Sequence, residues 1–153
     1  MLSQFGKTPL ADFMLRPQSR ARLWLGLGYT RDCDPAVIDW AIASTCTAQG
    51  WEPSAIAALA TLDRKAADPR LIALAQTQGW PLIGYSAAQL RAYPVPNPST
   101  LVADRVATPS VAEAAALAAA QTIGTPRLLL PKQIWRHPPL PGIVTLAVAI
   151  APL

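Results

Sequence analysis

The chain has 153 residues, of which 52% are hydrophobic and 14% charged, so it is long enough to bury its own core as one soluble domain. Its longest apolar run, Ile143 to Leu153, falls short of the roughly 18 to 20 residues of a membrane helix, which excludes a membrane protein. The formal net charge of the chain is +4. Residues 1–22 hold four basic residues and one acidic residue, a net charge of +3, so the rest of the chain carries only 4−3 = +1. A basic end of this kind is not a basic face, so we expect no nucleic-acid partner.

Residues 1–22 lack the apolar stretch and cleavage site of a secretory signal. We expect this segment to be a flexible extension, followed by a single domain over residues 23–153. A chain without an export signal is expected in the cytoplasm, where Cys33 and Cys46 stay reduced. The two cysteines and His137 match no zinc spacing, so we expect no metal and no cofactor.

After residue 22, strand and helix signals alternate along the chain. Arg22–Leu27 is predicted to be the first strand, with Gly26 and Gly28 opening a turn. Asp34–Pro35 begins a helix, because Asp accepts the free N–H groups of the first turn and Pro has none to lose. Gly50 ends that helix.

A strand followed by a helix with an Asp-Pro start is predicted a second time. Ala57–Leu62 is compatible with a buried strand, although its alanine content would equally suit a helix. Asp68–Pro69 begins a second helix that Gly79 ends. Pro81–Tyr85 is the third strand, and Ser86–Arg91 is a brief helix that Ser86 caps.

The prolines of PVPNPS, residues 94–99, predict an extended loop. Ser110 and Glu113 then fit a capping box for a helix that continues through Ala114–Gln121.

Two strands are predicted near the end, Arg127–Leu130 and Ile143–Ile150, joined by a proline-rich loop over Pro131–Gly142. The whole order predicts an α/β fold of three layers, with a mainly parallel sheet, helices on both faces and a C-terminal hairpin-like strand pair. If the late apolar strand lies at a sheet edge, a homodimer is possible.

The segment Gly26–Arg31 begins like a dinucleotide fingerprint, but Arg31 stands where the third glycine belongs. A strand that passes through glycine into a helix presents backbone N–H groups to an anion, which makes Gly28 and Arg31 candidate ligand contacts. The alternative is a turn that needs small residues for packing.

Asp63, Arg64 and Lys65 come directly after the second strand, at the end of the sheet where ligands of open α/β folds bind. Lys65 is suited to pair with an acidic group, and Asp63 to accept from a hydroxyl or water. The alternative is a solvated loop. Lys132, just after the strand Arg127–Leu130, is predicted to join the same rim.

Four more polar residues lie beside predicted helix starts: Asn97, Ser99, Thr108 and Ser110. Capping explains Ser99 and one of Thr108 and Ser110, which leaves two groups for a ligand. No catalytic constellation is present, and Asp63 and Lys65 are the candidates for catalysis.

Five strings resemble, in order and spacing, the family of the cobalamin biosynthesis protein CobE and the C-terminal domain of CbiG: GLGYTR, ALATLDRKAADP, PVPNPS, TPSVAEAAAL and VTLAVA. The resemblance spans residues 23–150 and implies a three-layer α/β fold. With no partner domain before the matched strings, the chain is expected to be most like the stand-alone form, CobE. The family tends to have Cys or Ser with two Arg and Gly after Gly28, where this chain has Tyr29, Thr30, Arg31 and Asp32.

The resemblance implies a protein that binds or helps to process a precorrin or cobyrinic-type corrinoid, with other pathway enzymes as further partners. Such ligands are flat and edged with carboxylates, which suit helix N-termini, Arg31, Lys65 and Lys132. The alternative is a hydrolase that opens the lactone of cobalt-precorrin-5A and releases acetaldehyde, as the resemblance to CbiG implies. Asp63 would then orient water, and Lys65 would stabilise the oxyanion.

Overall fold

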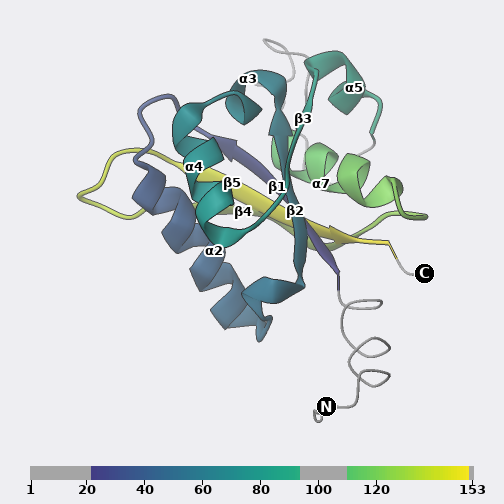
Figure 1. Ribbon diagram of the computed structural model, residues 1–153, viewed down its shortest axis with the longest axis horizontal. Helices are drawn as coiled ribbons and strands as arrows, with labels where there is room; N and C mark the ends of the chain where they lie inside the picture. The colour runs from purple at the N-terminus through teal and green to yellow at the C-terminus, as the bar shows by residue number, and fades with distance from the viewer. Residues whose placement is uncertain (1–21, 94–109, 152–153) are drawn as a thin grey trace.

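The computed structural model describes residues 22–93 and 110–151, which fold around a sheet of five strands (Figure 1). The strands are β1 Leu23–Tyr29, β2 Ile56–Leu62, β3 Leu82–Tyr85, β4 Arg127–Trp135 and β5 Val144–Ile150. The helices are α2 Pro35–Gln49, α3 Asp63–Ala66, α4 Pro69–Gln78, α5 Ala87–Arg91 and α7 Val111–Gln121, with a 3-10 turn over Pro53–Ala55.

The sheet is mixed, with the strand order β3-β2-β1-β5-β4. Its first three strands run parallel, whereas β5 is antiparallel to both β1 and β4. The α/β fold and the C-terminal hairpin-like strand pair are therefore confirmed. Parallel pairing brings the carboxyl ends of β1, β2 and β3 to one edge of the sheet, and this edge holds the candidate site described below.

Helices α2 and α4 both begin at the predicted Asp-Pro pairs. The side chain of Asp34 accepts from the Ala36 amide at 2.9 Å, and that of Asp68 accepts from the Arg70 amide at 3.0 Å. Gly50 and Gly79 end these helices with φ of 74° and 78°, a left-handed conformation that glycine adopts without strain. The sequence signals for these two helices are confirmed at both ends.

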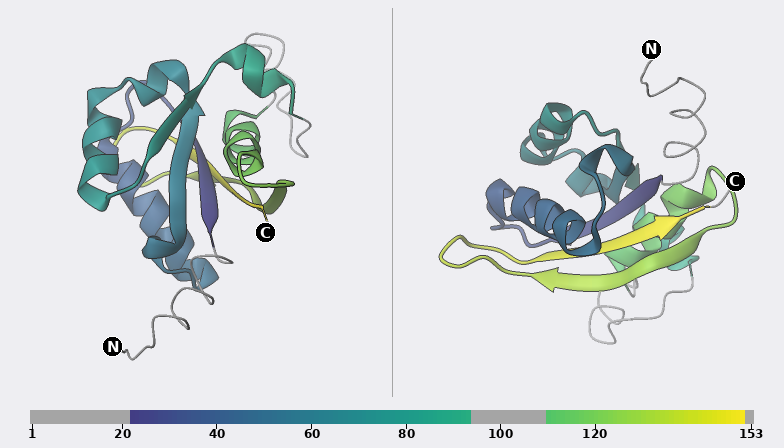
Figure 2. Two further views of the ribbon diagram at one scale, coloured as in Figure 1. Left: turned by 45° about the vertical axis from the view of Figure 1, so that its right-hand side comes forward. Right: turned by 90° about the horizontal axis from the view of Figure 1, so that it is seen from below.

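Helices cover both faces of the sheet, as predicted (Figure 2). Helices α2 and α4 pack on one face against the large side chains of alternate strand positions, such as Leu25, Leu27 and Leu146. Helices α5 and α7 lie on the other face, where small residues such as Ala60 and Ala149 meet the alanines of α7. The strands β1 and β5 are buried on both faces, which explains their nearly continuous apolar sequences.

The turn predicted at Gly26 and Gly28 is wrong, because β1 continues through both glycines to Tyr29. Helix α7 lies so close to the strand that a Cβ at Gly26 would sit 1.8 Å from the backbone oxygen of Ala112. The glycines serve close packing, which was the alternative explanation for this segment.

The end of the predicted strand at Leu130 is also wrong. Strand β4 runs on through Pro131 and Lys132 to Trp135, and it forms the edge of the sheet beyond β5. An edge strand tolerates proline because one side of its ladder is unpaired, and the β4–β5 register shifts on both sides of Leu130. The late apolar strand β5 thus lies inside the sheet, so the premise of the homodimer does not hold for that strand.

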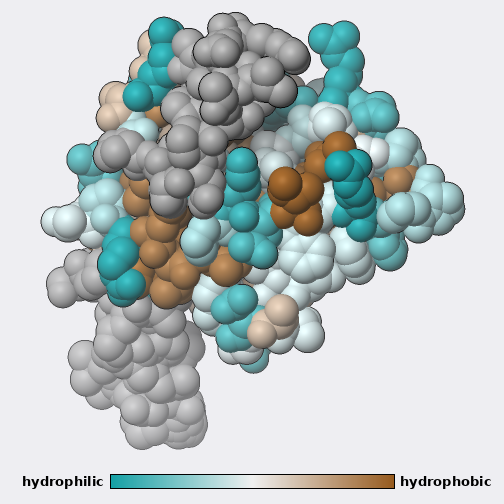
Figure 3. Space-filling model, turned by 180° about the vertical axis from the view of Figure 1, so that it is seen from behind, coloured by the Kyte–Doolittle hydropathy of each residue, from teal (hydrophilic) through white to brown (hydrophobic). Residues whose placement is uncertain are grey.

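In residues 22–93 and 110–151, three large hydrophobic residues are exposed, Ile123, Leu129 and Ile134, the last two of them on β4. On the face of the molecule seen from behind, hydrophilic side chains lie between the groups of apolar atoms (Figure 3). Across the described residues, no helix has both the length and the apolar character that a membrane span requires.

Candidate functional site

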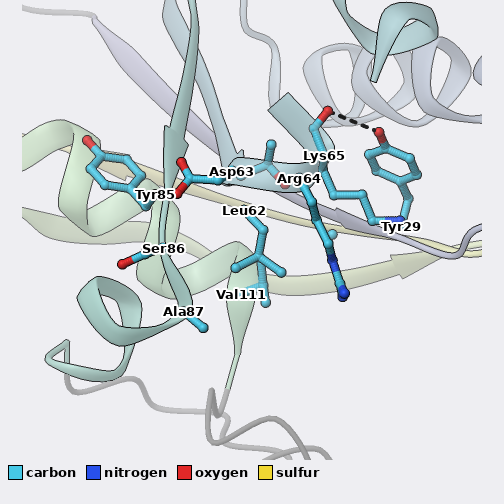
Figure 4. Close-up of a pocket in the computed structure, with 11 residues that line it drawn as sticks. Tyr29, Leu62, Asp63, Arg64, Lys65, Tyr85, Ser86, Ala87 and Val111 are labelled. Carbon is cyan, nitrogen blue, oxygen red and sulfur yellow. Dashed lines mark hydrogen bonds between the residues drawn. The ribbon is translucent and has the colours of Figure 1, made fainter. Parts of the chain in front are cut away.

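A pocket of about 500 Å³ opens at the carboxyl ends of the three parallel strands (Figure 4). This is the position at which open α/β sheets bind ligands. Eleven residues line the pocket: Gly28, Tyr29, Thr61, Leu62, Asp63, Arg64, Lys65, Tyr85, Ser86, Ala87 and Val111. They come from β1, β2 and β3, from α3, from α5 with its N-cap Ser86, and from the first residue of α7.

The charged rim of the pocket exists because β2 leads into α3 without a loop. Leu62 is the last residue of β2 and the N-cap of α3, so Asp63, Arg64 and Lys65 follow one another along the edge (Figure 4). Gly84 on the neighbouring strand makes room for this turn, because a Cβ there would sit 2.8 Å from Oδ1 of Asp63. The mixed charge cluster predicted from the sequence therefore lies on the short helix α3 and lines a cavity, with Asp63 and Arg64 exposed and Lys65 partly buried.

Lys65 is held against an aromatic ring. Its Nζ lies 4.3 Å from the ring centre of Tyr29, within the range of a cation–π contact. Partial burial lowers the pKa of Lys65, and the neighbouring cations Arg64 and Arg31 lower it further. The site thus contains a partly desolvated ammonium group, which a ligand anion would stabilise.

The Tyr29 ring is itself fixed by hydrogen bonds. Its hydroxyl donates to Oδ2 of Asp68 at 2.9 Å and lies 3.5 Å from the Lys65 carbonyl oxygen (Figure 4). Burial raises the pKa of the Tyr29 phenol far above its usual range, and the bond to Asp68 adds to the effect. Tyr29 is therefore a neutral donor at all ordinary pH values.

Asp68 is paired in turn with Arg70. The guanidinium donates to both carboxylate oxygens, at 3.3 and 3.1 Å, and reaches the carbonyl oxygen of Cys33 at 3.1 Å. These bonds from Arg70 hold the pKa of the Asp68 carboxyl below its usual range. A connected network thus joins the turn after β1, the start of α4 and the pocket.

The opposite wall of the pocket is largely apolar. Leu62, Tyr85, Ala87 and Val111 supply it, and each of them is only partly buried. Val111 is the first residue of α7, whose N-terminus is capped by Ser110 Oγ, the acceptor for the Glu113 amide at 3.4 Å. The rim carries the cations Arg64 and Lys65 and the carboxylate of Asp63, and its two cations beside an apolar wall suit an acidic ligand with a hydrophobic body.

Of the predicted site residues, Gly28, Asp63 and Lys65 meet in this pocket. Arg31 is exposed in the turn beyond β1, outside the lining but close enough to lower the pKa of Lys65. Ser110 is buried in its capping role beside the pocket residue Val111. That any of these residues binds ligand stays a prediction.

The remaining predicted residues lie elsewhere. Lys132 is inside β4 and does not follow a strand end, and its backbone N–H donates to the buried Glu113 carboxylate at 3.0 Å. Its expected place on the rim is wrong because β4 is five residues longer than predicted, ending at Trp135. Asn97, Ser99 and Thr108 lie outside the described residues.

Sequence reasoning missed Tyr29, Thr61 and Tyr85, which line the pocket. The contacts of Tyr29 with Lys65 and Asp68 span 36 and 39 positions, beyond the reach of local patterns. A signal for Tyr29 did exist, because the alternation Leu23, Leu25, Leu27 extends to it and predicts that it faces the core side.

His137 lies apart from the pocket residues and stacks on Trp40, with ring centres 4.1 Å apart. Within the described ranges, no three metal-ligating side chains are grouped so as to hold a metal ion.

The family model of the cobalamin synthesis G C-terminus matches residues 23–149. Among solved structures, CobE, a protein from the cobalamin biosynthetic pathway, superposes with a TM-score of 0.71 at 29% identity, covering 84% of this chain and 89% of that chain. The cobalamin biosynthesis protein chiG from Agrobacterium tumefaciens gives 0.59 at 25% identity, covering 84% and 98%.

A putative cobalamin biosynthesis protein G homolog from Sulfolobus solfataricus shares the fold, with a TM-score of 0.60 at 17% identity over 84% of this chain and 36% of that chain. No curated protein matches the chain by sequence. The family match covers nearly all of the strands and helices described above. The chain therefore belongs to the family of the cobalamin synthesis G C-terminus.

Proposed function

We propose that this protein binds a corrinoid or precorrin intermediate of cobalamin biosynthesis, with the acidic edge of the ligand in the pocket at the ends of β1, β2 and β3. One observation carries the proposal, namely a cavity of about 500 Å³ that combines the cations Arg64 and Lys65 with an apolar wall. The family context of cobalamin synthesis supplies the class of ligand.

The chemistry of such a ligand matches the two sides of the pocket. Acetate and propionate side chains at the edge of the macrocycle pair with ammonium and guanidinium groups, in charge-assisted hydrogen bonds that are about twice as strong as neutral ones. The flat ring system has a large apolar surface, which Leu62, Tyr85 and Val111 are suited to cover. Arg31, exposed nearby, adds positive charge that attracts a polyanion.

The test is an absorbance titration of the purified protein with metal-free and cobalt-containing corrinoid acids, with the pigment followed through gel filtration. We expect the pigment to migrate with the protein, and Lys65→Ala to weaken binding by about tenfold or more. Arg127→Ala is the matched control, because Arg127 is exposed at the opposite end of the sheet. If no corrinoid acid binds at micromolar concentration, the proposal is wrong.

The same protein preparation tests the alternative of a lactone hydrolase. Asp63 and Lys65 line one cavity, so a base and an oxyanion-stabilising cation are both available. If the protein released acetaldehyde from a lactone-containing precorrin, and Asp63→Ala lowered that rate by about a hundredfold while binding persisted, the chain would be an enzyme. A binding protein shows no such turnover.

A further inference from the structure

The two rim cations of the pocket differ in how they are held. Arg64 is exposed and makes no hydrogen bond or ion pair within the described part of the chain. Lys65 is partly buried, with its Nζ 4.3 Å from the ring centre of Tyr29. A flexible lysine side chain loses conformational entropy when it is fixed, so a preformed contact of this kind lowers the cost of using it as a ligand-binding group.

The ammonium group of Lys65 contacts an aromatic ring and not a carboxylate, so the contact does not cancel its positive charge. In the described ranges, no Asp or Glu forms an ion pair with Lys65. The carboxylate that raises the pKa of Lys65, Asp68, is occupied by Arg70 at 3.1 Å and by the Tyr29 hydroxyl at 2.9 Å. The ammonium of Lys65 is therefore oriented without being neutralised.

The ring beneath it is rigid. Tyr29 is 8% exposed, and its hydroxyl is anchored on Asp68, which Arg70 fixes to the carbonyl oxygen of Cys33. These contacts fix the ring against Lys65. Among the described lining residues, this is the one cation with such a support.

From these contacts we infer that Tyr29 is a positioning residue that presents Lys65 to one carboxylate of the ligand, so that the pocket distinguishes a free carboxylate from an amide at that position. This inference rests on the proposed function and adds to it a preference of the pocket for a carboxylate over an amide. A carboxylate gains a charge-assisted bond to Lys65, whereas an uncharged amide gains only a neutral one. Arg64, which lacks such a support, attracts the acidic edge of the ligand as a whole and selects no particular position on it.

The experiment compares a corrinoid whose side chains are free acids, cobyrinic acid, with one whose side chains are amides, cobinamide. Its readout is the ratio of the two affinities, which a general loss of structure would leave unchanged. The wild type should prefer the acid by about tenfold or more. Lys65→Ala and Tyr29→Leu should each lower that preference several-fold, with the remainder due to the other cations, and the double variant should lose little beyond Lys65→Ala, because both changes remove one interaction.

Tyr29→Phe keeps the ring and removes the bond to Asp68. It should keep most of the preference and lose only part of the affinity, and it stays informative if Tyr29→Leu fails to fold. Tyr93→Phe is the control for the loss of a phenol hydroxyl, because Tyr93 bonds Gln121 outside the pocket lining. In the ligand-free protein, the NMR signals of the Lys65 side chain should carry a ring-current shift that Tyr29→Leu removes and Tyr29→Phe retains.

Two outcomes separate the inference from the proposed function. If the wild type binds both corrinoids, and Tyr29→Leu weakens both by the same factor or leaves the preference intact, the inference is wrong and the proposed function stands. If the wild type binds neither corrinoid, the proposed function is wrong. An absent ring-current shift on Lys65 would overturn the positioning role of Tyr29 by itself.

Discussion

The two faces of the sheet are packed in opposite ways. On the α2–α4 face, large side chains interlock, with Leu27 and Leu146 from the strands meeting Ile38 and Ile42 from α2. On the α7 face, glycine and alanine from the strands meet an alanine-rich helix. Here the distance between the helix and the sheet is limited by contacts of the strand with backbone atoms of the helix. The first face buries more apolar surface per residue, whereas the second fixes the position of a helix more tightly.

This difference bears on the pocket. Because small residues bring α7 close to β1, its first residue, Val111, reaches the pocket, and a Cβ at Gly28 would lie only 3.9 Å from that side chain. The other face contributes Tyr29, whose ring lies under Lys65. We therefore expect changes on the α7 face to affect both stability and the placement of a pocket wall, and changes on the α2–α4 face away from Tyr29 to act mainly through stability.

The largest effect is expected from Gly26→Ala. The added Cβ would lie 1.8 Å from the Ala112 oxygen and 2.7 Å from the Ala116 nitrogen, both backbone atoms that cannot rotate away. Forcing α7 outward should cost about 3 kcal/mol or more of unfolding free energy, measured by urea denaturation. Gly28→Ala is the matched control and should cost less, because its closest contact is the rotatable Thr145 hydroxyl at 2.7 Å. Equal losses would contradict backbone-limited packing.

Leu27→Ala tests the large-residue face. Leu27 is fully buried, so its truncation leaves a cavity and should lower the unfolding free energy by about 2 to 5 kcal/mol. Leu129→Ala removes the same atoms from an exposed site of the edge strand and should change stability by about 0.5 kcal/mol or less. A small loss at Leu27 would mean that this face is loosely packed.

Glu113 is the one charged residue that is fully buried in the described chain, and it ties α7 to the irregular part of β4. Glu113→Ala removes the acceptor of the Lys132 backbone N–H and should cost about 1 to 3 kcal/mol, measured by thermal or urea unfolding. Glu113→Gln retains an acceptor oxygen and should recover part of that loss. If both variants were as stable as the wild type, this bond would not anchor the helix.

The smallest effect is a pH dependence that arises from Asp68. Its pKa is lowered in the folded state, so its carboxylate stabilises the fold above the unfolded-state pKa of about 3.9, and that stabilisation disappears as the pH falls through the folded-state pKa. Asp68→Asn should therefore be slightly less stable than the wild type at pH 7. The difference should close as the pH is lowered below about 4, because the wild-type carboxyl then becomes neutral too. A constant difference across that range would contradict the assignment.

Local signals predicted much of the fold. The two Asp-Pro pairs and the glycines at positions 50 and 79 located α2 and α4 at both ends, because caps are read from neighbouring residues. Gly26 led to a wrongly predicted turn. The glycine is needed because α7 packs closely on β1 near Ala112, which is more than 80 residues away in sequence. Pro131 led to a strand end that was predicted too early. A proline is tolerated there because β4 is an edge strand, which only the strand order of the folded sheet reveals.

For the site, chain order alone identified Asp63 and Lys65, because residues after parallel strands meet at one edge. The support of Lys65 could not be predicted in this way. Tyr29, Asp68 and Arg70 come together only through the pairing of β1 with β2 and the return of the chain into α4.

The most direct test of the account is amide NMR of the labelled protein during titration with a corrinoid acid. Binding in the proposed pocket should shift the signals of Gly28, Leu62 to Lys65, Tyr85 to Ala87 and Val111, while those of Gly50 and Arg127 stay in place. Shifts centred elsewhere, or none at saturating ligand, would contradict the claim that this edge of the sheet binds the corrinoid.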